Sequence, residues 1–230
     1  MKIIFWGETA PFETTQNMYT LAALIAKRCP GHPIRMYRFR GMGEEYYHLY
    51  REQTKRFREC SAYESNSHGR NVSKPNLCKG SACENGAYQK SAGTGIGEEL
   101  EFYDFGAKRD NKVFRQMREA DVLVLNMPQE SRAWEWLIER RMVCYENVLY
   151  LLSGYQLYNM VNREFIEHMY RIERQNIGLI PYNNEFVYFT RQGKLAEFLE
   201  TRYRGNEKNR LFMQELQRTV TLLLRHMKMM

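Results

Sequence analysis

The sequence predicts an α/β fold in which a mostly parallel β-sheet is covered by helices on both faces. Short apolar segments alternate with amphipathic segments almost throughout the chain, which is typical of strands joined by right-handed helical crossovers. Residues 121–127 are almost uniformly apolar, as expected for a central strand that is buried on both sides. A length of 230 residues suits one such domain, so residues 1–230 are treated as one unit.

The first predicted strand, residues 2–6, is a short apolar run. Four further runs have the same character, and they are residues 34–39, 100–105, 147–152 and 177–180. In sheets of this kind, ligands bind beyond the carboxyl ends of the strands. We therefore expect the loops that follow the strands to line one edge of the sheet. These loops follow Trp6, Phe105, Met127, Leu152 and Ile180.

Helices are predicted between these strands. The first follows a loop at residues 7–13, is capped by the hydroxyl of Thr14 or Thr15, and stops before Pro30. Its apolar side chains recur at helical spacing from Met18 to Ile25. The other predicted helices cover residues 44–59, 113–118, 130–142, 163–174, 194–203 and 208–227.

Residues 61–97 differ from the rest of the chain, because Gly, Ser, Asn and Lys dominate and no periodicity persists. We predict an irregular polar insertion there. Cys78 and Cys83 lie in this segment, with His68 as the nearest additional ligand, but no second pair of ligands completes a zinc site. The five cysteines are odd in number and irregularly spaced, which does not indicate a disulfide framework.

Composition limits where the protein can reside and which partners it can bind. No apolar run is long enough to cross a bilayer, and the N-terminal run is too short for a secretory signal, so we expect a cytoplasmic protein. The formal net charge of +7 permits contact with DNA, RNA or an anionic membrane surface. The basic residues are spread along the chain without a dense cluster, which favours an ordinary solvated basic surface.

The segment after the first strand, FWGETAPFETTQNMYTLAALIA, resembles the phosphate loop of the ParA/MinD group of P-loop ATPases. In that family the loop has the form K-G-G-x-G-K-T-T and leads into a helix. Thr14 and Thr15 align with the paired hydroxyl residues, and Leu21 and Ala22 match the start of the family's helix. The resemblance implies a P-loop fold, with helices on both sides of the sheet.

Three later segments are similar to the same family in the same order. In LEFYDFGAKRD, Asp104 takes the place of the family's catalytic-site aspartate. The segment EADVLVLNMPQES is similar to the next central strand, and IGLIPYNNEF to the strand and proline turn beside the adenine. The resemblance implies that ATP and magnesium could bind, with the metal held by Thr14 and Asp104. The implied nucleotide site comprises Gly7, Glu13, Thr14, Thr15, Asp104, Pro181 and Tyr182.

The loop differs from the family at the two lysine positions, whose positive charge attracts phosphate groups. Glu8 stands at the signature lysine and Glu13 at the P-loop lysine, which normally attracts the β- and γ-phosphates. Like charges about 4 Å apart repel by roughly 4 kcal/mol at an effective dielectric constant near 20, so these glutamates oppose phosphate binding. Pro11 removes an N–H donor, and Phe12 adds bulk where a glycine permits close approach.

These departures favour a pseudo-ATPase that serves as an interaction or positioning module in pilus, secretion, polar or partition machinery of bacteria. A protein partner is then expected, either a second copy or a ParA/MinD-like relative. Two alternatives stay open: a weak or atypical ATPase that uses Asp104 and the threonines, and a partition protein that binds DNA through its basic surface.

The C-terminal segment allows two interpretations, because Val220, Leu222 and Leu223 are mixed with Arg218 and Arg225. A basic amphipathic helix can lie on a membrane surface, as the tails of MinD-type proteins do, which would make the protein peripheral at the membrane. A final helix that packs on the sheet has the same pattern, and we favour this interpretation.

Overall fold

The structure, a computed structural model, describes residues 1–8, 11–39, 58–62, 97–140, 145–202 and 206–230. Seven strands in these ranges form one sheet in the order β3-β2-β4-β1-β5-β6-β7, and all neighbours are parallel. The strands are β1 (Lys2–Gly7), β2 (Ile34–Phe39), β3 (Arg58–Ala62), β4 (Leu100–Asp104), β5 (Val122–Met127), β6 (Val148–Tyr155) and β7 (Ile177–Pro181). The predicted parallel α/β sheet is confirmed.

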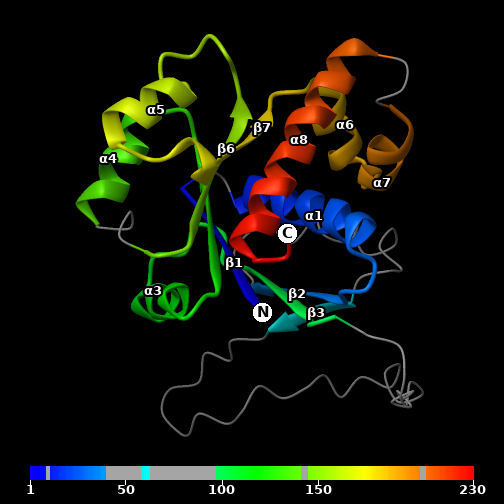
Figure 1. The fold of residues 1–230 in the computed structure, drawn as a ribbon, viewed down its shortest axis with the longest axis horizontal. Helices are drawn as coiled ribbons and strands as arrows, with labels where there is room; N and C mark the ends of the chain where they lie inside the picture. The colour runs from blue at the N-terminus through cyan, green and yellow to red at the C-terminus, as the bar shows by residue number, and fades with distance from the viewer. Residues whose placement is uncertain (9–10, 40–57, 63–96, 141–144, 203–205) are drawn as a thin grey trace, which may run out of the picture.

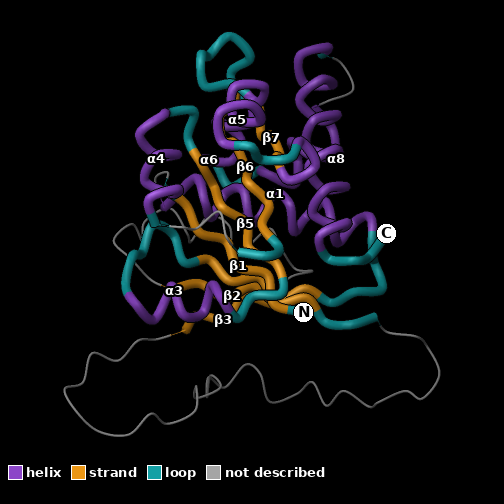
Figure 2. The backbone as a smooth tube through the Cα atoms, turned by 60° about the vertical axis from the view of Figure 1, so that its left-hand side comes forward, coloured by secondary structure: helices purple, strands orange, loops and turns teal. Residues whose placement is uncertain are grey.

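Helices cover both faces of this sheet (Figure 1 and Figure 2). The helices on one face are α1 (Pro11–Arg28), α6 (Asn184–Arg191), α7 (Leu195–Glu197) and α8 (Glu207–His226), and those on the other are α3 (Asn111–Arg118), α4 (Ser131–Glu139) and α5 (Arg163–Tyr170). A 3₁₀ turn, η3 (Arg174–Asn176), leads into β7, and a π-helical turn (Phe198–Arg202) follows α7. Successive side chains of a strand point to opposite faces, so Ile3 joins the core beneath α1 and Ile4 joins the core on the other side.

The first helix begins earlier than predicted, since α1 starts at Pro11. Thr14 and Thr15 therefore lie inside the helix, and the prediction that one of them is the N-cap was wrong. Proline suits the first helical position because its missing N–H would have had no partner there and its ring fixes a helical φ. The connection between β1 and α1 is accordingly shorter than the predicted seven-residue loop.

Strand β3 was not predicted. Arg58 and Glu59 were assigned to the end of a helix and Ser61 to the polar insertion, yet residues 58–62 pair with β2 in parallel register. An edge strand is held by backbone bonds on one side only and does not require an apolar run. The rest of the predicted helix at 44–59, and residues 63–96 of the insertion with His68, Cys78 and Cys83, lie outside the described residues.

Helix α6 was also missed, because residues 182–184 were interpreted as a turn. The side chain of Asn183 accepts a hydrogen bond from the Phe186 N–H at 2.9 Å and so caps this helix. Helix α5 ends at Tyr170, before the predicted Arg174, because Arg171 takes a left-handed conformation with φ of 52°. The other predicted strands and helices are present, with shifts of a few residues at their ends.

Helix α8 packs on the sheet, as favoured from the sequence. The apolar side chains that a membrane tail would expose are buried in the core with α1, and they are Val220, Leu222, Leu223, Leu224 and Met227. The apolar face of α8 is thus occupied by the interior of the protein. Among the described residues, no helix combines the length and the apolar character that crossing a membrane would require.

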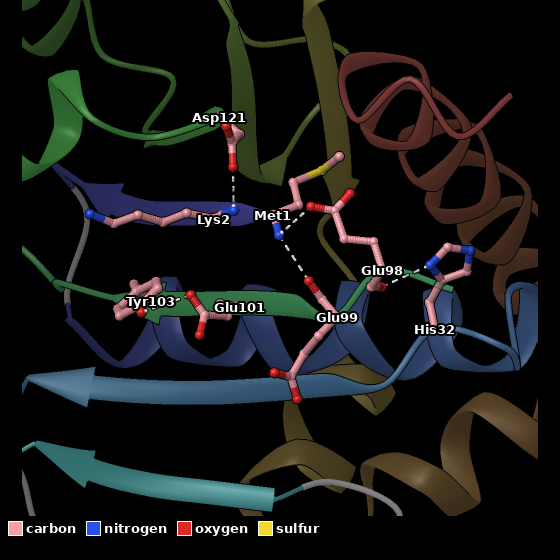
Figure 3. Close-up of polar contacts among 8 residues, drawn as sticks. All are labelled: Met1, Lys2, His32, Glu98, Glu99, Glu101, Tyr103 and Asp121. Carbon is pink, nitrogen blue, oxygen red and sulfur yellow. Dashed lines mark hydrogen bonds and ion pairs between the residues drawn. The ribbon is translucent and has the colours of Figure 1, made fainter. Parts of the chain in front are cut away.

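Polar contacts hold the amino ends of the central strands (Figure 3). The α-amino group of Met1 donates to a carboxylate oxygen of Glu98 at 3.0 Å and to the carbonyl of Glu99 at 2.9 Å, just before β4. The backbone N–H of Lys2 donates to Asp121 Oδ2 at 2.6 Å, just before β5. These bonds fix β1 between its two neighbours at the edge opposite to the expected ligand edge.

The free edge of β7 is closed by a single side chain of α8. The hydroxyl of Thr219 accepts a hydrogen bond from the Leu179 N–H at 2.9 Å and donates one to the Leu179 carbonyl at 2.8 Å. Both backbone groups are therefore satisfied without a further strand. Gly178 allows this approach, because a Cβ atom at that position would lie 2.8 Å from Thr219 Cγ2.

Substituting Gly178→Ala should lower the free energy of unfolding by about 1–3 kcal/mol, because the new methyl group displaces Thr219 from Leu179. Urea unfolding measures this difference. Gly31→Ala is the matched control, since a Cβ there meets no atom within 4 Å, and its effect should stay within about 0.5 kcal/mol. Equal effects of the two substitutions would contradict the proposed role of the Gly178–Thr219 contact.

Candidate functional site

The candidate site lies where β1, β4 and β5 end. The Gly7 N–H at the end of β1 donates to the carbonyl of Gly106 at 2.9 Å, and the Glu8 N–H donates to the carbonyl of Asn126 at 3.1 Å. The loop after β1 is thus fixed on one side to the loop after β4 and on the other to the end of β5. This confirms that the loops after Trp6 and Phe105 meet at one edge of the sheet, beside the end of β5.

Asp104 is a buried carboxylate that joins two of these segments. Its side chain is 2% exposed. The Thr15 hydroxyl, in the first turns of α1, donates a hydrogen bond to one carboxylate oxygen, and the Gly106 N–H donates to the other at 2.9 Å. The structure therefore brings together two predicted site residues, Asp104 and Thr15. Groups of the protein already satisfy both oxygens of Asp104.

Thr14 is fully buried next to this pair in the sequence. Its hydroxyl has no hydrogen-bond partner among the described residues. A buried hydroxyl without a partner costs about 1–3 kcal/mol, so such groups usually have an explanation in strain, bound water or a ligand. Thr14 is also the residue that the family resemblance assigns to magnesium.

A network of neutral polar groups lies beneath the loop, and sequence reasoning found only one of its members. Asn126, which was predicted to be a satisfied buried amide, donates to the Trp6 carbonyl at 3.1 Å. Its side-chain oxygen accepts from Asn17 Nδ2 at 2.9 Å, and the same nitrogen lies 2.6 Å from Ser153 Oγ. The network connects β1, β5 and β6 to α1. The available signal for Asn17 was its position next to Met18, at the start of the apolar face of the predicted helix.

A second feature missed from the sequence is an ion pair between Glu8 and Arg109. The Glu8 side chain is 16% exposed. The Arg109 guanidinium also lies over the ring of Trp136, 4.5 Å from its centroid, and Trp136 stacks on Trp6 at 5.5 Å. The Trp6 ring N–H donates to the Lys108 carbonyl at 2.6 Å, which fixes the loop that holds Arg109. The acidic loop residue is therefore neutralised by a cation from the loop after β4.

Glu13, at the position of the P-loop lysine, has an exposed side chain in the first turn of α1. Surrounding protein atoms nevertheless remove part of its hydration, and this desolvation raises the pKa of the Glu13 carboxyl above its ordinary value. Ionisation of Glu13 is therefore less favourable in the folded protein than in the unfolded chain. It also places negative charge at a helix N-terminus that would otherwise favour an anionic ligand.

Pro181 and Tyr182 lie apart from the loop in the strand order, because β5 and β6 separate β7 from β1. Tyr182 is 50% exposed, and its N–H donates to the Tyr155 carbonyl at 2.9 Å. Both residues are at the carboxyl edge, as predicted, but no contact among the described residues joins them to Thr14 or Asp104. The described part of the chain also contains no cluster of three or more His, Cys, Asp or Glu side chains that could hold a metal ion.

Replacing Glu13 with glutamine should raise the free energy of unfolding at pH 7. Because desolvation raises the carboxyl's folded-state pKa, the unfolded state releases its proton more readily, and ionisation weakens the fold as pH rises. The gain should vanish below about pH 4, where the carboxyl is protonated in both states. Urea unfolding at both pH values tests this. Glu139→Gln, at an exposed site on α4, is the control, and a Glu13→Gln effect that is equal at both pH values would contradict the argument.

Replacing Asp104 with alanine should destabilise the protein by about 2–4 kcal/mol, because the Thr15 hydroxyl and the Gly106 N–H would lose their buried acceptor. Thermal or urea unfolding measures the loss. Asp121→Ala removes a carboxylate that accepts one N–H bond at an exposed site, and it should cost less than about 1 kcal/mol. A small effect of Asp104→Ala would show that the carboxylate does not hold these segments together.

Comparisons with known proteins agree on the architecture. No protein-family model matches the chain, and no curated protein matches its sequence. A solved chain of the MinC:MinD cell division protein complex of Aquifex aeolicus superposes with a TM-score of 0.57 at 12% identity, covering 97% of this chain and 96% of that one. MinD of the same organism gives 0.56 at 11% identity, with 97% of each chain covered.

A Borrelia burgdorferi B31 protein, described as a plasmid partition protein and solved with bound AMPPNP, gives a TM-score of 0.56 at 10% identity. The superposition covers 97% of this chain and 98% of that chain. Similarity at these identities establishes a shared fold. The chain therefore has the α/β fold of the MinD and partition-protein structures, as the resemblance of its sequence to the ParA/MinD group predicted.

Proposed function

We propose that this chain is a cytoplasmic ParA/MinD-like protein that no longer hydrolyses ATP and acts as an interaction or positioning module. The observation that supports this most directly is the Glu8–Arg109 ion pair. An acidic side chain stands in the phosphate loop, and its partner is an arginine from the neighbouring loop. That cation neutralises Glu8 and so is not free to attract a phosphate group.

The surroundings of Arg109 strengthen this argument. Its guanidinium lies over Trp136 while it pairs with Glu8, so moving it toward a ligand would break two favourable contacts at once. Glu13 contributes a second carboxylate at the N-terminus of α1. Glu13 would repel the negative charges of a triphosphate, and Glu8 withholds Arg109 from them, at the place where the family attracts them with lysine.

Among the described residues, the loop offers one candidate ligand to a magnesium ion but not a complete metal site. The buried Thr14 hydroxyl has no partner among the described residues, which suits a ligand to magnesium. Both oxygens of Asp104 already accept hydrogen bonds from Thr15 and Gly106. Glu8 and Glu13 oppose the phosphates that usually bring magnesium to such a loop, so we assign no catalytic step to this site.

The proposed interaction role rests on an analogy with the structural neighbours of this chain. One structural neighbour was solved as a MinC:MinD cell division protein complex, and another is described as a plasmid partition protein. By analogy, the partner of this chain would be a second copy or a ParA/MinD-like relative. Without a nucleotide switch, such an assembly would be constitutive. Peripheral contact with a membrane would then depend on the partner, because the apolar face of α8 is buried.

A weak ATPase is the alternative function that a specific observation favours. The unpartnered Thr14 hydroxyl and the nearby Thr15–Asp104 pair retain the side of the site that the family uses for magnesium. In addition, the Borrelia burgdorferi neighbour was solved with AMPPNP. A DNA-binding partition protein stays a prediction from the net charge of +7.

Isothermal titration with ATP and magnesium, combined with an assay of phosphate release, tests the proposal. The wild-type protein should show neither micromolar binding nor turnover, and light scattering should give the same oligomeric state with and without ATP. The variant Glu8→Lys/Glu13→Lys should gain affinity, because it removes two repulsive carboxylates and releases Arg109.

The matched control is Glu135→Lys/Glu139→Lys, which changes the net charge equally at exposed positions of α4 and should gain no affinity. An equal gain in both variants would show that overall charge, and not the loop, governs binding. Micromolar binding with turnover by the wild-type protein would reject the non-hydrolysing role in favour of the weak ATPase.

A further inference from the structure

A pocket at the amino end of β7 is lined by three arginines. It lies between η3, which leads into the amino end of β7, and the C-terminal half of α8, with a volume of about 330 Å³. It is lined by Arg174, Gln175, Arg218, Thr221, Leu222 and Arg225. The candidate loop lies at the carboxyl ends of the strands, so the pocket is at the opposite edge of the sheet.

Helical spacing places the pocket residues of α8 on one face of that helix. Residues 218, 221, 222 and 225 recur at intervals of three and four and therefore share one face of the helix. Leu222 is buried, whereas the two arginines on this face retain solvent access. Arg28, at the end of α1, donates to Thr221 Oγ1 at 2.7 Å, which places a further cation beside the pocket.

Carboxylates neutralise these arginines only in part. Glu167 lies 3.8 Å from Arg174 and Glu215 lies 3.9 Å from Arg218, so both are ion pairs, although both distances are too long for a hydrogen bond. Arg225, the third arginine of the lining, has no ion-pair partner within the described ranges. One lining arginine is therefore without a carboxylate, and the other two make only long ion pairs.

Arg163, at the start of α5, adds a further cation. Its Nε and Nη1 atoms are buried and have no hydrogen-bond partner in the described part of the chain. Burial lowers the pKa of the Arg163 guanidinium and the charges of Arg218 and Arg174 lower it further, whereas the charges of Glu215 and Glu164 raise it. Arg163 therefore interacts with the lining arginines and with nearby carboxylates, and an anion within reach of its buried Nε and Nη1 atoms would satisfy these donors.

We propose that this pocket binds a small phosphorylated anion. Guanidinium groups match the geometry of phosphate oxygens because each presents parallel N–H donors. The amide of Gln175 already donates to the Glu173 carboxylate, so the arginines are the donors that matter. The floor at Leu222 accepts an apolar part of the ligand. A concave site of this volume suits a small molecule better than an extended nucleic-acid backbone, which tracks a continuous basic surface.

Calorimetric titration of the full-length protein with inorganic pyrophosphate at low salt tests the proposal. The wild-type protein should bind it, and Arg218→Gln/Arg225→Gln should weaken binding at least about tenfold, because two charge-assisted contacts are lost. Arg210→Gln, on the same helix but outside the pocket, should keep the wild-type affinity. Glu13→Gln should also keep it, which separates this pocket from the loop at the opposite edge.

Thermal unfolding without pyrophosphate checks that the arginine variants remain folded. Undetectable pyrophosphate binding by the wild-type protein would overturn the proposal, as would an equal loss in the Arg210→Gln protein. Tight, salt-sensitive binding of a short DNA duplex without pyrophosphate binding would also overturn it and would assign the arginines to nucleic acid. Tighter pyrophosphate binding by Glu13→Gln, together with unchanged binding by Arg218→Gln/Arg225→Gln, would place the anion in the loop and would also overturn the proposal.

Discussion

A sheet whose strands all run in one direction, with both faces buried, determines the rest of this structure. Since all strands are parallel, the ends of β1, β4 and β5 lie at one edge, and Asp104, Glu8 and Asn126 converge there although they are distant in the sequence. Since both faces must be covered, the chain supplies amphipathic helices on each side, and α8 uses its apolar side chains for this purpose. The same constraint exposes the edge of β7, which Thr219 then closes.

The sequence was informative wherever burial dictates the residue type. The central strands were predicted because a strand buried on both faces needs a continuous apolar run, as β5 shows. Strand β3 was not predicted because an edge strand pairs through its backbone, and this pairing does not require an apolar sequence. Helix α6 escaped because Asn183 is equally suited to a turn and to a helix cap, and local sequence alone does not separate the two.

The candidate site was only partly predictable for a related reason. Asp104 and the threonines were named from the resemblance to the ParA/MinD family, and the structure places Asp104 in contact with Thr15. The Asn17–Ser153 contact joins positions separated by 136 residues, and no local pattern indicates such a pair. The Glu8–Arg109 ion pair depends on the tryptophan rings that position the guanidinium, so it required the folded geometry.

Charge is distributed unequally between the two edges of the sheet, and this difference links the two proposals. At the carboxyl edge, Glu8 and Glu13 stand where an anion would bind, and Arg109 is engaged by Glu8. At the amino end of β7, a pocket is lined by Arg174, Arg218 and Arg225, of which the first two make only long ion pairs with carboxylates. The acidic residues of the loop thus oppose a phosphorylated molecule at the edge that usually binds ligands, whereas the arginines at the opposite edge would attract one. A protein of this design would recognise an anion without using its phosphate loop, and the loop would then serve to hold α1 and the neighbouring strands in place.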